Sequence, residues 1–270
     1  MPTATNIPRG PTTADLVFII PSEDGSALRV DDSFLSESAM KEVHSVLITD
    51  IRGNEDSFNL EVHAFEALRN VESSTPDEVF VDDDAIKNVY YPEVSKLLQQ
   101  HLGVQEVAIQ GHGVRRQGKD GQRQPINFVH ADHSADVARR MAQEHASQTK
   151  KNHLRDKRYR IFSVWRPLNG IVESMPMAFV AGDSLDKNDL FPVQYSDPHN
   201  EFTGLRFNPG QRWYYWSGMH NTERLLLQCT DSRAGLHAAG QTPHSAFAHV
   251  GSSRDAKPRE SIEVRALVFG

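Results

Sequence analysis

Apolar and polar residues alternate along much of the chain after about residue 105, with the period of two that strands require. Glycine, proline, asparagine and aspartate interrupt the alternation in most of the gaps. Two apolar runs nearer the N-terminus, at 16–20 and 46–51, are also typical of short strands. The other predicted strands are residues 106–114, 125–132, 159–166, 175–182, 211–218, 224–231, 243–250 and 259–269.

Helical periodicity is confined to two stretches. Residues 85–103 repeat apolar side chains mostly at intervals of three to five, and Gly103 suits the end of a helix. Pro92 either kinks this helix or begins its second half. Residues 134–158 are rich in charge and predict a solvated helix, whereas residues 183–210 predict an irregular excursion.

The order of these elements indicates a mainly β protein with flanking helices. A double-stranded β-helix, which is a cupin-like jelly roll, accommodates eight strands in two sheets. We therefore predict a single domain over residues 15–270, after a flexible tail of residues 1–14 that is rich in threonine and proline. An immunoglobulin-like sandwich is the alternative, but it has no need of the helix at 85–103.

Composition narrows the classes of function. The formal charge of −7 and the pI of about 6.0 argue against a nucleic-acid partner. No apolar run approaches a membrane span, and the first 15 residues lack the apolar core of a signal peptide. The single cysteine, Cys229, fits a reducing compartment and hence a cytoplasmic protein. Cys229 alternates with Leu225 and Leu227, which predicts a buried, inert thiol. The oligomeric state stays open, with a homodimer as one option.

A candidate metal site begins at His130. A strand places alternate side chains on one face, so His130 and Asp132 point into the same cavity, as two ligands of a facial triad do. The chain has 13 histidines, and a histidine followed two residues later by an acid is expected about once by chance. A second such pair, His199 and Glu201, lies outside any strand pattern and is interpreted as coincidental.

A third ligand is available far downstream, where His244 and His249 compete. Their odd separation places them on opposite faces of a continuous strand, so only one can face the metal. His244 shares its face with two alanines, which leave room for an ion, whereas His249 shares its face with Phe247. Spacing alone does not rank the two.

The last predicted strand carries an unusual polar face. Arg259, Ser261, Glu263 and Arg265 alternate with apolar residues. The planar fork of arginine matches a carboxylate, and a serine two residues later can add one hydrogen bond. The Arg259-x-Ser261 pair therefore predicts a site for an anionic ligand, and a solvent-facing edge strand is the alternative.

Several longer segments resemble the fungal hydroxylase/desaturase family, which includes gibberellin desaturase and the CmcJ-like cephamycin methoxylation proteins. They are VLITDIRGNEDSFNLEVHAFEAL, VYYPEVSKLL, FVHADHS, VWRPLNGIVESMPMAF, RWYYWSGMHNTERLLLQCTDS, TPHSAF and PRESIEVRALVF, in the family's order. The resemblance implies a non-haem iron(II)- and 2-oxoglutarate-dependent oxygenase that uses O2 to hydroxylate or desaturate a small secondary metabolite. It implies that His130, Asp132 and His244 bind iron, and that Arg259 and Ser261 bind 2-oxoglutarate.

The chain departs from the family at two positions near these motifs. Ser163 replaces an asparagine that usually precedes VWRPL, and His133 stands where glutamine or tyrosine is more usual. Both changes put the substrate in doubt. Arg166, and the aromatic pair Trp213 and Tyr215, are candidate substrate contacts, although an aromatic cluster is more often part of a core.

Two other functions compete with an oxygenase. A catalytically inert jelly roll would act by interaction within a biosynthetic pathway, and the intact His130, Asp132 and His244 set argues against it. A zinc-dependent hydrolase would favour three histidines or a positioned general base, and the HExxH motif is absent from the sequence.

Overall fold

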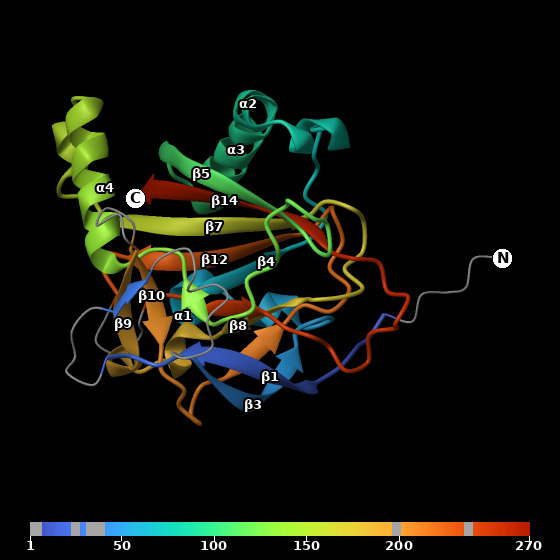
Figure 1. The fold of residues 1–270 in the computed structure, drawn as a ribbon. Helices are drawn as coiled ribbons and strands as arrows, with labels where there is room; N and C mark the ends of the chain where they lie inside the picture. The colour runs from blue at the N-terminus through green and yellow to red at the C-terminus, as the bar shows by residue number, and fades with distance from the viewer. Residues whose placement is uncertain (1–6, 23–27, 31–40, 196–200, 235–239) are drawn as a thin grey trace.

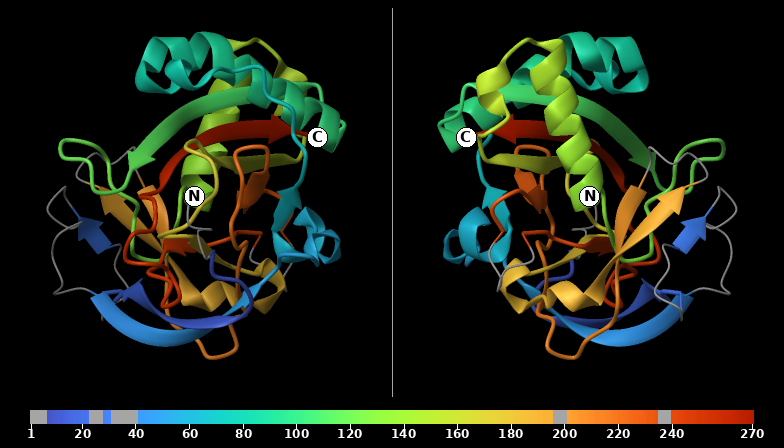
Figure 2. Two further views of the ribbon diagram at one scale, coloured as in Figure 1. Left: turned by 90° about the vertical axis from the view of Figure 1, so that its right-hand side faces the viewer. Right: turned by 90° about the vertical axis from the view of Figure 1, so that its left-hand side faces the viewer.

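Two β-sheets stacked on one another form the body of the molecule (Figure 1). The computed structural model describes residues 7–22, 28–30, 41–195, 201–234 and 240–270. The nine-stranded sheet has the order β1-β3-β11-β8-β13-β6-β10-β9-β2 and curls strongly, whereas the five-stranded sheet has the order β4-β12-β7-β14-β5 (Figure 2).

The larger sheet consists of β1 (Thr12–Ile19), β2 (Leu28–Val30), β3 (Lys41–Asp50), β6 (His130–Ala131), β8 (Met177–Val180), β9 (Leu190–Tyr195), β10 (Glu201–Leu205), β11 (Trp213–Tyr215) and β13 (His244–Ala246). The smaller consists of β4 (Phe65–Leu68), β5 (Glu106–Arg116), β7 (Tyr159–Pro167), β12 (Arg224–Asp231) and β14 (Glu260–Phe269). The helices are α1 (Leu60–His63), α2 (Asp83–Ala85), α3 (Tyr91–Leu102) and α4 (Ala135–Gln148).

The inner faces of the two sheets meet in an apolar core. Phe65, Leu225 and Leu227 of the small sheet pack in one buried cluster with Phe179 of the large sheet. Phe65 and Phe179 are in edge contact, with ring centroids 4.6 Å apart. Two sheets joined through their inner faces form the predicted jelly roll, with helices outside it.

The outer face of the small sheet is covered by the predicted N-terminal helix. One π-helical turn, Ile86–Tyr90, leads directly into α3, and Pro92 occupies the first turn of α3. The π-helical turn accommodates the proline, because the regular ladder of helical hydrogen bonds is already interrupted there. Gly103 ends α3 in the left-handed conformation that glycine adopts at little cost.

The sequence predicted a solvated helix at residues 134–158, but one side of α4 is buried. Ala138, Ala142 and Ala146 form a buried stripe that packs on Ile161 and Leu267 of the small sheet. Small side chains at intervals of four allow the helix to approach the sheet closely while its charged faces stay in water. The prediction of a helix is confirmed, and its solvated character holds for the other faces only.

The prediction of an irregular excursion at residues 183–210 is wrong, because this region contains β9 and β10. Pro192 and Gly204 concealed them, since both residues are uncommon inside strands. Among the described residues, the pairing of β9 with β2 begins at Val193, one residue after Pro192. Phe191 packs over Gly204, so the glycine provides space for a ring.

The boundary of the predicted N-terminal tail is also wrong. Residues 12–14 belong to β1, where Thr12 pairs with Ile48 of β3. Burial alternates from Thr12 onward, so the strand pattern begins before the apolar run at 16–20. Arg9 donates a hydrogen bond to the carbonyl of Ser217 at 2.7 Å, whereas residues 1–6 lie outside the described part of the chain.

Candidate metal centre

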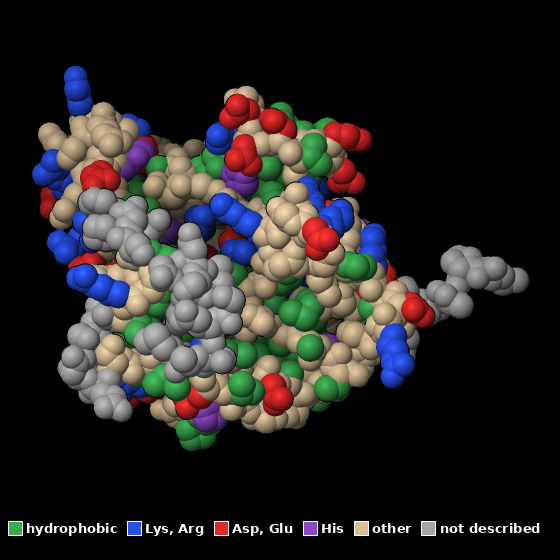
Figure 3. Space-filling view, viewed as in Figure 1, with side chains coloured by type: hydrophobic (Ala, Val, Ile, Leu, Met, Phe, Trp, Pro, Cys, Tyr) green, Lys and Arg blue, Asp and Glu red, His purple; other side chains and the backbone are tan. Residues whose placement is uncertain are grey.

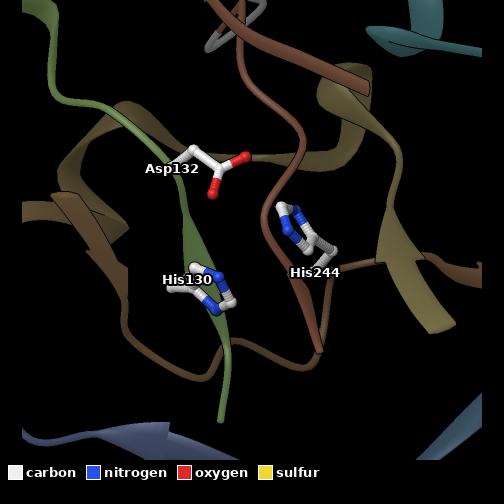
Figure 4. A group of neighbouring side chains, drawn as sticks. All are labelled: His130, Asp132 and His244. Carbon is white, nitrogen blue, oxygen red and sulfur yellow. The ribbon is translucent and has the colours of Figure 1, made fainter. Parts of the chain in front are cut away.

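Neighbouring strands of the large sheet bring the three predicted metal ligands together. His130 of β6 and His244 of β13 are paired directly in an antiparallel ladder, so their side chains share one face. Asp132 follows β6 immediately. One potential ligand atom from each of these residues lies within 4.8 Å of the others, and the three side chains converge on a common space (Figure 4).

Both imidazoles are oriented by the same backbone contact. Nδ1 of His130 donates to the carbonyl of Phe128, and Nδ1 of His244 donates to the carbonyl of Thr242, each at 3.0 Å. A carbonyl only accepts, so each Nδ1 carries the proton and each Nε2 keeps a free lone pair. A hydrogen bond of this kind fixes the tautomer of metal-binding histidines.

The charge states also suit a metal. Burial, assisted by the charge of His244, lowers the pKa of His130 to about 3, so this imidazole is neutral near pH 7. Burial opposes ionisation of Asp132, but Arg265 and the neighbouring histidines outweigh it and hold the pKa of this carboxyl well below its usual range. Two imidazoles and one carboxylate are the donor set of the facial iron(II) triad.

The competing residues lie elsewhere. The side chain of His249 contacts the hydroxyl of Tyr215 at 3.2 Å, and it is not part of the group formed by His130, Asp132 and His244. Glu201 of the second acidic pair lies in β10 and accepts a hydrogen bond from Gln194 of β9, whereas His199 lies outside the described residues.

The facing strand β14 presents its polar row to this centre. Ser261, Glu263 and Arg265 alternate with residues of the outer core, so they occupy the inner face. Arg265 Nη1 lies 4.0 Å from Asp132 Oδ1. The alternative of a solvent-facing edge strand is therefore wrong, because β14 lies between β7 and β5 and its polar residues are mostly buried.

Arg259 and Ser261 have the unsatisfied polar atoms that an anionic ligand would need. Arg259 is 2% exposed; it lies over the ring of Trp165 and donates to the carbonyl of Met175, but its Nε has no partner among the described residues. Ser261 Oγ is also buried, and no residue in the described ranges bonds to it. Burial, and then the charge of Arg115, lower the pKa of Arg259 to about 9. A buried cation that has no carboxylate partner in the described ranges has the chemistry to bind an anionic ligand.

Charged side chains continue from this row toward solvent. Arg115 of β5 contacts Glu263 at 3.3 Å. Gly113 makes room for this pair, because a Cβ there would lie 2.9 Å from Glu263 Oε1. The side chains of Arg115 and Arg265 keep 18% and 27% of their surface exposed. The space-filling view shows a recess in this face of the molecule with lysine or arginine side chains inside it (Figure 3).

The prediction of Trp213 and Tyr215 as substrate contacts is wrong. In β11 it is Tyr214 that pairs with Phe179, and Phe179 pairs in turn with His244, so Tyr214 occupies the face of the metal group. Trp213 and Tyr215 point to the opposite side and belong to a separate apolar core. The sequence shows that Trp213 and Tyr215 share one face of a strand. Only the pairing register shows which face of that strand points toward the metal group.

Arg166 was also assigned to the wrong face. It alternates with Trp165 in β7 and lies beneath the helical layer, where its guanidinium contacts the rings of Phe80 and Tyr90. It donates to Ser73 Oγ at 2.9 Å. Arg166 therefore serves the outer core, on the side of the small sheet away from the metal group.

Both departures from the family pattern lie at the centre. Ser163 pairs with Arg265 in register, and its buried Oγ has no partner in the part of the chain that the structure describes. His133 Nε2 is likewise buried with no partner among those residues, and burial lowers the pKa of His133 to about 4. These two side chains therefore bring unused polar atoms close to the predicted ligand residues.

Sequence reasoning missed two further residues beside the ligands. Cys229 was interpreted as inert, yet its Sγ lies 3.6 Å from Asp132 Oδ2. Phe202 of β10 lies edge-on to His130, with ring centroids 6.2 Å apart, but it belongs to the region interpreted as irregular. Cys229 alternates with core leucines, so only the structure could show that it reaches the opposite sheet.

A jelly roll that joins two imidazoles and a carboxylate, beside a buried arginine, defines the class of non-haem iron(II) oxygenases that use a 2-oxo acid. Comparison with known proteins gives the family. A family described as Oxidoreductase/YMDC permease-like domain matches residues 16–269, and the chain belongs to it.

Individual relatives are fungal oxygenases. The chain is 32% identical over 236 residues to the Fe(II)/2-oxoglutarate-dependent dioxygenase NvfI of Aspergillus novofumigatus. The matched region covers 84% of each of the two chains. It is 28% identical over 255 residues to the hydroxylase/desaturase PoxK of Penicillium oxalicum. That matched region covers 83% of this chain and 78% of PoxK.

A solved structure of the iron and alpha-ketoglutarate-dependent endoperoxidase NvfI matches with a TM-score of 0.85 at 28% identity, over 97% of this chain and 99% of that one. The predicted resemblance to the fungal hydroxylase/desaturase family and the predicted jelly roll are both confirmed.

Proposed function

We propose that this protein is a non-haem iron(II)- and 2-oxoglutarate-dependent oxygenase that oxidises a small secondary metabolite. One observation carries the proposal: the Nε2 atoms of His130 and His244 are both left free by their backbone contacts, beside the carboxylate of Asp132. Relatives of the same family are named as Fe(II)/2-oxoglutarate-dependent dioxygenases and hydroxylase/desaturases.

The three ligands would hold iron(II) and leave open positions for O2 and cosubstrate. Arg259 and Ser261 would bind the distal carboxylate of 2-oxoglutarate, which their orphaned Nε and Oγ support. Bound iron, cosubstrate and O2 supply the oxidising chemistry, with succinate and CO2 as the products of the cosubstrate.

The protein's own contribution is orientation and the exclusion of water. Phe128 and Phe202 flank His130, at ring distances of 5.2 and 6.2 Å, and form an apolar wall on one side. Arg115, Glu263 and Arg265 form a charged side opposite. A substrate with an apolar body and a polar group fits between two such walls.

The cellular setting is part of the proposal. We infer that the enzyme acts in the cytoplasm, since a single cysteine suits a reducing compartment. None of the helices in the described ranges is long and apolar enough to cross a membrane. A homodimer stays a prediction.

Anaerobic reconstitution with iron(II) and 2-oxoglutarate, followed by admission of O2, tests the function through succinate release. We expect turnover in the wild type and a severe loss of both iron and turnover in Asp132→Ala. Glu201→Gln is the matched control, because it alters the acid of the other His-x-acid pair, and it should behave as the wild type.

The same experiment separates the rival functions. An inert interaction protein would release no succinate with any candidate metabolite, even with iron bound. A zinc-dependent hydrolase would be active without 2-oxoglutarate and would be indifferent to Arg259→Ala. Either pattern would contradict the proposal.

A further inference from the structure

A thiol on the small sheet reaches the carboxylate of the candidate metal centre. Cys229 of β12 is 1% exposed, and its Sγ lies 3.6 Å from Asp132 Oδ2. The carbonyl oxygen of Leu227, at 3.8 Å, is a second acceptor. A thiol has one hydrogen and donates to one acceptor at a time, and a carboxylate is the stronger of these two.

The Asp132 carboxylate has little else to hold it. Among the residues that the structure describes, Cys229 supplies the one hydrogen bond to Asp132 that meets normal geometric limits. Arg265 Nη1 lies 4.0 Å from Oδ1, which is an ion-pair distance but too long for a hydrogen bond. The thiol is therefore placed to set the orientation of the carboxylate.

The backbone of β12 is irregular at this residue. Gln228 pairs with Phe162 and Thr230 pairs with Ile161, so Cys229 is an additional residue in its strand. Such a β-bulge redirects side chains and is common next to active sites. Here the irregular residue is the one whose side chain meets Asp132.

A second irregularity lies one residue away along the ladder of the small sheet. The pairing of β14 with β5 shifts between Arg265 and Ala266, which makes Gln110 the additional residue. The two shifts fall beside the two side chains that approach Asp132 from this sheet, namely Cys229 and Arg265. This coincidence favours a role in the site over an accident of packing.

We propose that Cys229 is a positioning residue of the metal centre, whose S–H donates to Asp132 Oδ2 so that the other oxygen faces the two imidazoles. The inference rests on the proposed function. The terminal torsion of an aspartate is soft, so an unrestrained carboxylate can turn and offer both oxygens to a metal. A hydrogen bond that holds Oδ2 keeps Asp132 a monodentate ligand. The open positions that a facial triad needs are then preserved.

The S–H stretching band in the infrared tests the contact in metal-free protein. Cys229 is the only cysteine of the chain, so this band comes from one residue. We expect it at a lower frequency than that of a free thiol, and we expect it to move upward in Asp132→Ala. If the frequency of the band is the same in Asp132→Ala as in the wild type, the thiol donates to the carbonyl of Leu227 instead, and the inference is overturned.

Binding of Co(II) alone, followed anaerobically by its ligand-field bands, tests the consequence. Cys229→Ala should weaken Co(II) binding by about 10-fold, as expected for loss of an outer hydrogen bond. Cys229→Ser keeps a donor and should stay within about 3-fold of the wild type. Thr230→Val is the matched control, because it removes a buried, unpartnered hydroxyl from the next residue and should change nothing.

The outcomes separate this inference from the proposed function. If Asp132→Ala abolishes Co(II) binding while Cys229→Ala binds as the wild type does, the inference is overturned and the proposed function stands. A serine variant as weak as the alanine variant would assign the effect to packing and also overturn it. If Asp132→Ala binds Co(II) as the wild type does, the metal lies elsewhere, and both proposals fall.

Discussion

His130 and His244 are oriented by an identical local device, a hydrogen bond from Nδ1 to the carbonyl two residues earlier in the chain. Spacing in the sequence could restrict the third ligand to one of two histidines but could not choose between them. The register chooses, because His244 pairs directly with His130. His249 lies beyond β13 and contacts Tyr215 instead.

His244→Ala should therefore remove most of the bound iron, because a facial triad that has lost one of three ligands keeps too few to retain the metal. His249→Ala should retain it. Iron content after anaerobic loading and desalting measures the difference. A greater loss of iron in His249→Ala would reverse the assignment.

Arg259→Ala should raise the 2-oxoglutarate requirement about 30-fold or more, since the loss of a charge-assisted contact costs about 2 kcal/mol or more. Iron binding should be nearly unchanged. Arg259→Lys should restore part of the affinity, because an ammonium cannot form the fork. Ser261→Ala should show a milder form of the same defect. Succinate formation against 2-oxoglutarate concentration provides the measurement.

Arg265→Ala is the comparison for this series, since Arg265 carries the same charge on the same face of β14. Its guanidinium lies beside Asp132, whereas that of Arg259 lies over Trp165. We expect Arg265→Ala to weaken iron more than cosubstrate. A larger shift in the 2-oxoglutarate requirement than in Arg259→Ala would move the anchor to Arg265.

At the scale of elements, the sequence predicts the strands that form uninterrupted runs between turn residues and misses strands that are broken. β7, β12 and β14 begin and end within one residue of their predicted bounds, because nearly every residue in each run is buried. β9 and β10 were missed, since a proline and a glycine interrupt short strands. The faces of Arg166 and Trp213 depend on register, which is a long-range property that no local pattern contains.

Gly204 of β10 pairs with Phe191 of β9 on one side and with His130 of β6 on the other. A Cβ at this position would lie 2.6 Å from the ring of Phe191. Gly204→Ala should therefore cost about 1 to 3 kcal/mol of unfolding free energy through overpacking. Urea unfolding measures this cost.

A double-mutant cycle identifies the cause. In a Phe191→Ala background, Gly204→Ala should cost less than about 1 kcal/mol, because the ring that it meets is gone. An equal cost in both backgrounds would contradict the steric explanation and assign the effect to the backbone of β10.

For the whole molecule, the candidate centre joins parts of the chain that are distant in sequence and lie on facing sheets. Its ligands come from β6 and β13 of the large sheet, whereas Cys229 and the cosubstrate pair come from β12 and β14 of the small one. The order of the motifs along the chain can be read from the sequence. That their side chains converge on one centre was implied by the family resemblance and could not be derived from spacing.

A metal that bridges β6 and β13 should stabilise the native state, because the unfolded chain cannot present these ligands together. At a free metal concentration 100 times the dissociation constant, the gain is about 2.7 kcal/mol, or a rise in Tm of about 5 °C for a chain of this size. We expect Co(II) to produce this rise and a chelator to reverse it. Asp132→Ala should show no rise, although its metal-free Tm need not match that of the wild type. An equal rise in Asp132→Ala would mean that other histidines, of which the chain has several, bind the metal.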